Sequence, residues 1–225
     1  MDIKLTNLLI VFFQRTNYID ISAVVDFITK NIDEFKKCKK NQFTVPPINL
    51  DTLPKVQLIS ESTPFYVIIF NNKIEFSATG IFEKNQYTEI CTSFLSVSKT
   101  FSKLVASKEN ICGRIGIVND SFIIEEKPAD LILNSFIKDS TIQKPSTIYI
   151  NYTNQERMGN IDINIINTIQ QGVLNTEPKR TGIIVHRDVN IKNMQPSIKS
   201  GEIEKFITFA GRKITEKEMA GILHG

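Results

Sequence analysis

One octapeptide has the residue types and the spacing of a catalytic loop. His186, Arg187 and Asp188 are followed by Asn193, five residues after the aspartate. In protein kinases, an aspartate in this position accepts the proton of the substrate hydroxyl, and the asparagine binds magnesium. The rest of the sequence contradicts a kinase, because no DFG or APE segment follows and no glycine-rich loop precedes. Residues 183–191 alternate like a β-strand, so we expect His186 and Asp188 on one polar face.

Two arginines and one histidine are the candidates for contact with a ligand. Arg187 falls on the apolar face of the predicted strand, so its guanidinium must reach the sheet edge or meet a buried carboxylate. Arg114 belongs to a predicted strand over 111–118 that contains two glycines, which favour a bulge or a close backbone approach. One hypothesis is therefore a ligand site formed by Arg114, His186 and Arg187, in a cleft between the sheet and a helix.

The tightest cluster of basic residues is Lys36, Lys37, Lys39 and Lys40. It ends a segment with helical periodicity over residues 20–36. Lysines at a helix C-terminus face the negative end of the helix dipole. A solvated helix end accounts for them, and a phosphate-binding basic patch is the functional alternative.

Other catalytic and metal-binding arrangements are missing from the sequence. It has two histidines and three distant cysteines with no CxxC pair, so we expect no disulfide framework and no metal. It also lacks a GxSxG nucleophile elbow and a GxxxxGK[ST] phosphate loop. We expect Cys91 and Cys112 to be small core residues, and Cys38, among lysines, to have the most depressed thiol pKa of the three. The sequence thus predicts no catalytic residue and no cofactor.

The composition is that of a globular protein. Of the 225 residues, 41% are hydrophobic and 23% charged, and the net charge is +3. This charge is well below that of a dedicated DNA-binding protein, so we expect no nucleic-acid partner. No apolar run is long enough to span a membrane, and unpaired cysteines indicate a reducing, cytoplasmic setting.

The apolar periodicity predicts an α+β fold with antiparallel sheets, each backed by a long helix. Residues 65–106 are its centre, with an apolar strand over 65–70, a turn, a second strand from 74, and a long amphipathic helix. Residues 1–110 and 111–225 are expected to be either two similar halves or parts of one continuous domain.

The remaining segments follow from turn and capping signals. We predict an edge strand over 55–60 and a hairpin with arms at 148–153 and 160–168, joined by a turn over 154–159. A proline-rich connection spans 41–54, and a capping box at 215–218 begins a terminal helical turn.

Three stretches together carry a family resemblance. They include Tyr87 near the start of the long helix, Phe94 further along it, and Asn119 at the end of a strand, within residues 72–94, 113–119 and 204–219. In this order they resemble an uncharacterised family of bacterial proteins, although the chain lacks the tryptophans common there. The resemblance implies a bacterial or phage-borne accessory protein beside defence or toxin–antitoxin genes. It implies no reaction and no catalytic residues.

The leading hypothesis is a non-catalytic protein-interaction or regulatory module that binds another protein or its own copy. Its contact elements would be the edge strands and the connection at 41–54. The alternatives are a small-ligand or nucleotide sensor and an enzyme that acts on a nucleotide or a phosphodiester. A sensor requires Arg114, His186 and Arg187 to converge, whereas an enzyme requires a perturbed acid, cysteine or histidine in a pocket.

Overall fold

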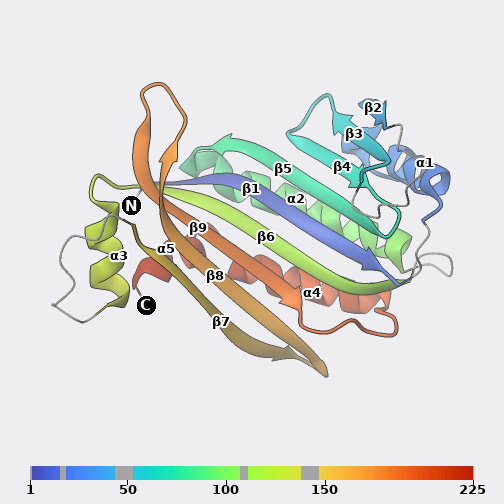
Figure 1. Cartoon of the computed structure of the whole chain (residues 1–225). Helices are drawn as coiled ribbons and strands as arrows, with labels where there is room; N and C mark the ends of the chain where they lie inside the picture. Colours follow the sequence, from blue (N-terminus) through green and yellow to red (C-terminus); the bar gives the residue numbers. More distant parts are fainter. Residues whose placement is uncertain (1, 16–18, 44–52, 107–110, 138–146, 225) are drawn as a thin grey trace.

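The computed structural model describes residues 2–15, 19–43, 53–106, 111–137 and 147–224, and the described strands form one nine-stranded antiparallel sheet (Figure 1). The strands are β1 (Asp2–Gln14), β2 (Cys38–Gln42), β3 (Val56–Ser60), β4 (Phe65–Ile69), β5 (Lys73–Phe82), β6 (Cys112–Ile124), β7 (Tyr149–Met158), β8 (Ile161–Leu174) and β9 (Arg180–Ile191). The helices are α1 (Ile21–Asn31), α2 (Lys84–Val105), α3 (Pro128–Phe136), α4 (Ser200–Lys213) and α5 (Glu216–Gly221), with 3-10 turns η1 (Asp33–Phe35) and η2 (Ile222–His224). The predicted α+β class is confirmed, with one sheet in place of several.

The long strands β1 and β6 lie at the centre of the sheet, whose order is β2-β3-β4-β5-β1-β6-β9-β8-β7. A three-stranded meander flanks each side of this pair, β3-β4-β5 on one side and β9-β8-β7 on the other. In the chain, α2 follows β5 and α4 follows β9. β1 belongs to residues 1–110 and β6 to residues 111–225, and the two strands pair with each other. The sheet is therefore continuous across the boundary between the two predicted halves.

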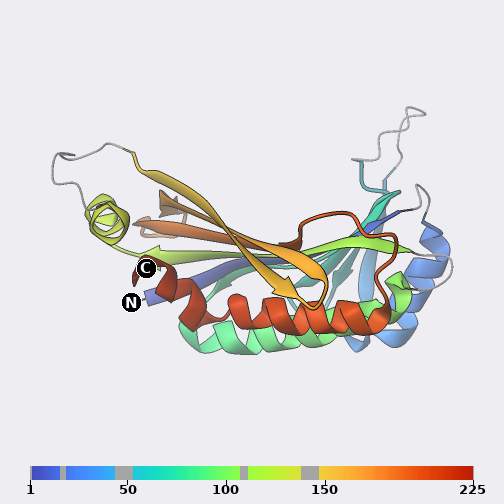
Figure 2. The same cartoon turned by 90° about the horizontal axis from the view of Figure 1, so that it is seen from below.

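The two longest helices, α2 and α4, lie side by side along one face of the sheet (Figure 2). The apolar face predicted for α2 is buried, and its phenylalanines pack on β5. The ring of Phe76 stacks on those of Phe94 and Phe101, with centroids 4.8 and 5.4 Å apart. Burial of such rings is the main favourable contribution to folding at this end of the sheet.

A buried polar network joins α2, β6 and the end of α4. Asn119 Nδ2 donates to the hydroxyl of Tyr87 at 2.8 Å and to the carbonyl of Ile214 at 3.0 Å. Its Oδ1 accepts from Ser121 at 2.8 Å. Because buried polar groups need partners, these bonds fix how both helices sit on the sheet. Two residues that carry the family resemblance, Tyr87 and Asn119, thus have a structural role here.

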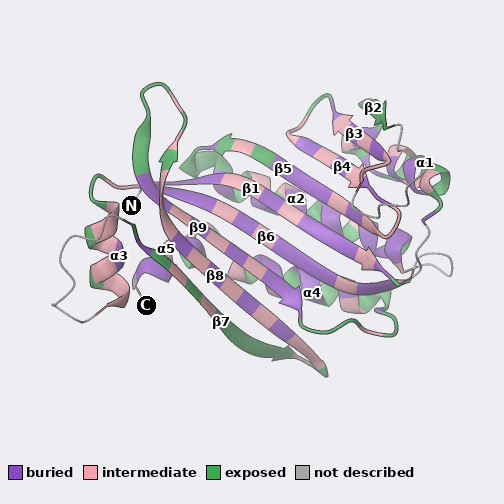
Figure 3. Ribbon diagram, viewed as in Figure 1, coloured by how far each residue is buried: buried purple, intermediate pink, exposed green. Residues whose placement is uncertain are grey.

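The opposite face of the sheet is turned toward the viewer in Figure 1, and none of α1 to α5 lies over its centre. Its central strands alternate between buried and intermediate residues (Figure 3). The buried positions point toward α2 and α4, and the intermediate ones lie on this uncovered face.

The helix predicted over 20–36 is shorter than expected. Asp20 caps α1, accepting from the amide of Ala23, but α1 ends at Asn31 and Ile32 is extended. A single 3-10 turn then buries Phe35, and the chain continues as β2, paired with β3. The reason is that a straight helix could not bring residues 38–42 alongside β3.

The hairpin β7-β8 is longer and its turn tighter than predicted. β7 continues to Met158, and Met158 pairs with Ile161, so Gly159 and Asn160 alone form the turn. Gly159 has φ 61°, a conformation that glycine adopts without strain and that two-residue hairpins need.

Two further predictions concern the segments around β2. The strand over 55–60 corresponds to β3, which is not an edge strand because β2 pairs with its outer side. Of the proline-rich connection at 41–54, residues 44–52 lie outside the described part of the structure.

Among described helices, none is long and apolar enough to cross a membrane.

Candidate functional site

Five polar side chains form a hydrogen-bonded row across the uncovered face of the sheet. Asn7 on β1 lies at its centre and donates from Nδ2 to Asp120 on β6 at 2.9 Å, and Asp120 contacts His186 Nδ1 at 2.6 Å. On the other side, Asn7 Oδ1 accepts from Thr79 at 3.1 Å, and the hydroxyl of Tyr66 lies 3.1 Å from that of Thr79. We call these five residues the polar row. It connects β4, β5, β1, β6 and β9, so it crosses between the two meanders.

The same line of polar residues continues to the edge of the sheet. Thr168 on β8 lies opposite His186 in the β8–β9 register. Asn151 Nδ2 on β7 donates to the hydroxyl of Thr168 at 2.9 Å. Cross-strand side-chain pairs of this kind help to set strand register.

His186 and Asp120 form an ion pair when the imidazole is protonated. The hydrogen bond that His186 donates to Asp120 raises the pKa of His186, burial lowers it, and the charges of Asp120 and Asp188 raise it further, with a net rise. The side chain of His186 is 37% exposed and that of Asp120 27%. A carboxylate-oriented imidazole can take part in proton transfer. Four cavities in the described part of the structure are lined by other residues, so the pair is better described as a cross-strand contact.

A second polar group lies beside the row on the same face. Arg114 donates from Nε to the carbonyl of Ile191 at 3.0 Å and from Nη2 to Asn190 Oδ1 at 3.1 Å. Asn190 in turn donates to Asp188 at 2.9 Å, and burial raises the pKa of Asp188. Gly116 makes this arrangement possible, because a Cβ there would lie 3.1 Å from that of Asn190. The predicted close backbone approach is therefore found at Gly116.

Arg187 points to the opposite, helix-covered side of the sheet. It is only 8% exposed. Its Nε donates to Asn167 Oδ1 at 2.7 Å and its Nη1 to the carbonyl of Lys213 at 2.6 Å. The carboxylate of Glu218, on α5, lies 3.7 Å from Nη1. Neither predicted alternative is found, because the guanidinium is buried beneath the sheet and donates to neutral acceptors, and the carboxylate of Glu218 is half exposed.

The three predicted ligand contacts are therefore divided between two faces. Arg114 and His186 share the uncovered face, and Arg187 lies beneath the sheet among helix residues. The cleft required by the sensor hypothesis, with all three side chains converging, does not match this arrangement.

The predicted basic patch also changes its setting. Lys39 and Lys40 belong to the edge strand β2, and Lys36 follows the 3-10 turn, where it pairs with Asp33 at 2.6 Å. Lys37 is exposed between them. The prediction that the four lysines end a helix was wrong, because β2 pairs with β3 instead. Edge strands that carry lysine resist pairing with further strands, which gives Lys39 and Lys40 a structural role.

The cysteines offer no activated nucleophile. Burial raises the pKa of Cys91 and of Cys112 to about 12. The pKa of Cys38 is also raised, first by burial and then by the charge of Glu61, while Lys40 lowers it. We expected Cys38 to have a depressed pKa, and the structure contradicts this because burial and Glu61 outweigh Lys40.

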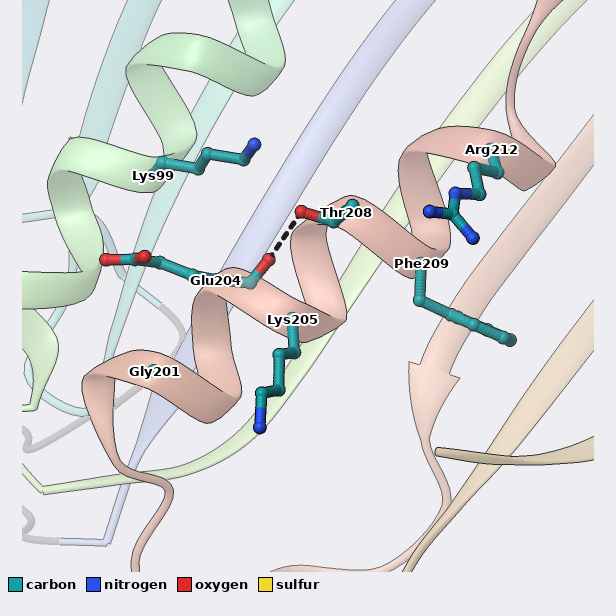
Figure 4. A pocket seen from close by; sticks show the side chains of 7 residues that line it. All are labelled: Lys99, Gly201, Glu204, Lys205, Thr208, Phe209 and Arg212. Carbon is teal, nitrogen blue, oxygen red and sulfur yellow. Dashed lines mark hydrogen bonds between the residues drawn. The ribbon is translucent and has the colours of Figure 1, made fainter. Parts of the chain in front are cut away.

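A shallow cationic groove lies between α2 and α4 (Figure 4). Lys99, Lys205 and Arg212 line it together with Phe209 and Glu204. Figure 4 shows the three cationic side chains pointing in different directions. The groove is a solvated seam between the helices, since no buried polar group faces it among these residues.

The two edge strands of the sheet differ in length and in charge. β2 has 5 residues, two of them lysines, whereas β7 has 10 and contains neither lysine nor proline. The two charged residues of β7 are already paired, Glu156 with Lys213 at 2.6 Å and Arg157 with Asp162 at 3.0 Å. Among the described residues, β7 pairs with β8 alone. Its other edge therefore presents a free row of backbone donors and acceptors.

Several residues of these groups were not identified from the sequence. Asn7, Thr79 and Asp120 are isolated polar residues in apolar strands, and only the strand register brings them together. Tyr152 and Glu218 approach Arg187 from elements distant in sequence. The one signal in the sequence was the presence of a polar residue within an apolar strand. That signal does not show which other side chain the polar residue contacts.

Comparison with known proteins found no match to this chain. No protein family matches the sequence, and no curated protein and no solved structure is significantly similar to it. Within the described residues, no group of three or more histidines, cysteines or carboxylates could hold a metal ion. The family resemblance, and the link to defence or toxin–antitoxin genes that it implies, stay predictions.

Proposed function

We propose that this protein is a non-catalytic interaction module that uses the edge strand β7 to pair with a strand of another polypeptide, either a partner protein or a second copy. The observation that carries the proposal is the length and composition of β7. Ten residues with mostly exposed side chains end the sheet, without the lysines or prolines that block such edges elsewhere. Strand addition supplies main-chain hydrogen bonds for affinity and alternate side chains for specificity.

The surroundings of β7 also support pairing. β8 holds it in a two-residue hairpin, so its free edge is presented in a fixed, extended conformation. The hairpin lies beyond α4 in Figure 1, and β7 is exposed along most of its length in Figure 3. An incoming strand would thus meet an ordered edge and would need little rearrangement of this chain.

The sensor and enzyme hypotheses receive less support. Arg114 and His186 lie on the face opposite Arg187, and both cysteine thiols of the core have raised pKa values. The pKa of His186 is raised, and its partner Asp120 belongs to the polar row that joins the strands.

The test adds charge beside the free edge. In Thr153→Lys combined with Gln155→Lys, we expect association to weaken at least tenfold, which is about 1.4 kcal/mol, because the new lysines repel an incoming strand. Both side chains are exposed, so the fold should persist. Affinity capture from the native host with mass spectrometry measures binding to other proteins, and analytical ultracentrifugation measures self-association.

The matched control places the same two charges elsewhere. Thr88→Lys combined with Thr92→Lys adds two lysines to exposed positions of α2. This variant should retain every partner and the wild-type sedimentation behaviour. If the β7 variant also retains them, β7 is not the contact element and the proposal fails.

We also propose that residues 1–110 and 111–225 are two similar halves. The support is the order of elements, since a long strand, a short helix, a three-stranded meander and a long helix occur in each. The first half has β2 in addition. On this proposal β3 and β7 are the corresponding outer strands of the two meanders, and β2 pairs with the outer side of β3 only.

A further inference from the structure

A cavity of about 350 Å³ opens on the helix side of the C-terminal meander, bounded by β7, β9, α5 and η2. It is separate from the polar row and from the free edge of β7. Its lining consists of Tyr152, Arg187, Lys217, Glu218, Gly221 and Ile222. The buried side chain of Arg187 is its most strongly polar group.

The charge of Arg187 is incompletely compensated. Its two hydrogen bonds go to neutral acceptors, the amide oxygen of Asn167 and the carbonyl of Lys213. Among the described residues, the nearest carboxylate is that of Glu218, which is 3.7 Å away and whose side chain is 49% exposed. That distance is too long for a hydrogen bond. A guanidinium this deeply buried ordinarily has a closely bound carboxylate, so the cavity retains an attraction for an anion.

Other donors lie near the guanidinium. The amide nitrogen of Asn167, Nδ2, is buried and has no acceptor among the described residues. Lys217 lines the cavity and is exposed, which adds a second positive charge at its mouth. Burial raises the pKa of Tyr152, and the nearby charge of Arg187 opposes that rise, so the phenol remains a neutral donor. Asn167 lies between Tyr152 and Arg187 in the strand register and does not itself line the cavity, so the donors that a ligand meets there are Arg187, Lys217 and Tyr152.

From these contacts we propose that the Arg187 cavity is a binding site for a single carboxylate group, and that Glu218 is a weak internal competitor for it. Glu218 already brings a carboxylate toward the guanidinium, which shows that the position suits this group. A doubly charged phosphate would be repelled more strongly by Glu218 and by Glu156, whose charge also acts on Arg187. Planar guanidinium and carboxylate groups also match in geometry.

The carboxylate can belong to a free small acid or to an acidic residue of a polypeptide. Tyr152 lies on β7, so an acidic residue of a polypeptide near that strand would be close to the cavity. The site does not depend on strand pairing, because its described lining comes from this chain alone. Failure of pairing at β7 would therefore leave the proposal intact.

The experiment follows the amide resonances of α5 by NMR while sodium acetate is added at constant ionic strength, with sodium chloride and inorganic phosphate as comparison anions. We expect saturable shifts with acetate, and weaker effects with both comparison anions. A capped pentapeptide of alternating threonine and valine with a central aspartate tests the polypeptide source, and the same peptide with asparagine is its control. Tighter binding of the aspartate peptide than of acetate would identify a polypeptide ligand, and equal or weaker binding would identify a free acid.

Two exposed substitutions change the affinity in opposite directions. Glu218→Gln should bind acetate about fivefold more tightly, because the internal competitor is removed, and Lys217→Ala about threefold more weakly, as expected for single exposed charges. Matched controls are Glu89→Gln on α2 and Lys205→Ala on α4, which remove the same charges from exposed positions elsewhere. Both should bind acetate as the wild type does.

None of these variants removes the buried arginine, so each should remain folded. The proposal is overturned if acetate produces no saturable shift in the wild type and in Glu218→Gln. It is also overturned if each control changes the affinity as much as its partner, since binding would then follow net charge and not the cavity.

Discussion

The two ends of the sheet are built on different principles. At the β2 end, β3, β4 and β5 lie over α1 and α2, and the phenylalanine rings of Phe65, Phe76 and Phe94 pack together. At the β7 end, the hairpin β7-β8 carries exposed polar side chains and has few contacts with α3 and α5. The edge strand is short and lysine-rich at the first end, and long and unprotected at the second.

This difference indicates that one end of the sheet stabilises the fold and the other is available to bind another chain. A strand that is well packed and closed by lysines contributes to folding and is protected from aggregation. A strand that is exposed on one face and only half-buried on the other contributes little to the core, and its free backbone groups are available to another chain. The β2 end therefore holds the fold, and the β7 end is the surface where we expect partners.

The largest effect should come from removing an aromatic ring at the β2 end. Phe76→Ala should lower the free energy of unfolding by about 3–5 kcal/mol, because Phe76 is fully buried and contacts four other rings. Tyr152→Ala at the β7 end removes a half-buried ring and should cost about 1 kcal/mol. Urea denaturation followed by circular dichroism measures both. Equal losses would mean that the two ends are held equally tightly.

The sequence predicted the two strands and the long helix within residues 65–106 better than it predicted either edge of the sheet. Apolar periodicity alone identified β4, β5 and α2, because each buries a continuous face. The same alternation correctly placed Arg187 on the apolar face of β9. It could not place Asn7, Thr79 and Asp120 together, since their contact depends on the register of strands far apart in the chain. Which strand lies at the edge of a sheet also depends on the order of all the strands. The prediction that β3 is an edge strand was wrong for this reason, because β2 pairs with its outer side.

A second prediction concerns the lysines of the edge strand β2. Lys39→Thr combined with Lys40→Thr should increase self-association about tenfold, because the charges that keep β2 from pairing are removed. Sedimentation velocity over a range of concentrations measures the association. Lys103→Thr combined with Lys205→Thr, at exposed positions of α2 and α4, removes the same net charge. Association in this control equal to that of the β2 variant would show that net charge, and not the edge, is responsible.

The smallest effect concerns the pair that joins the two ends. His186 lies on β9 and Asp120 on β6, and their hydrogen bond raises the pKa of His186 in the folded protein. Its stabilisation is therefore complete below the unfolded pKa of about 6.5 and is lost as the pH rises through the folded value. Since the side chain of His186 is more than a third exposed, we expect a contribution below about 1 kcal/mol.

Comparison of the wild type with His186→Gln by urea denaturation at pH 5.5 and 8.5 isolates this contribution. The substitution should destabilise the protein more at pH 5.5, and Asp120→Asn should abolish that pH dependence. Asp188 also faces His186, and the charges of the two groups act on each other's pKa, so Asp120→Asn is the variant that separates the contribution of Asp120. A larger loss at pH 8.5 would mean that the neutral imidazole holds the strands together. The junction of the two ends would then rest on strand pairing and packing, not on the ion pair.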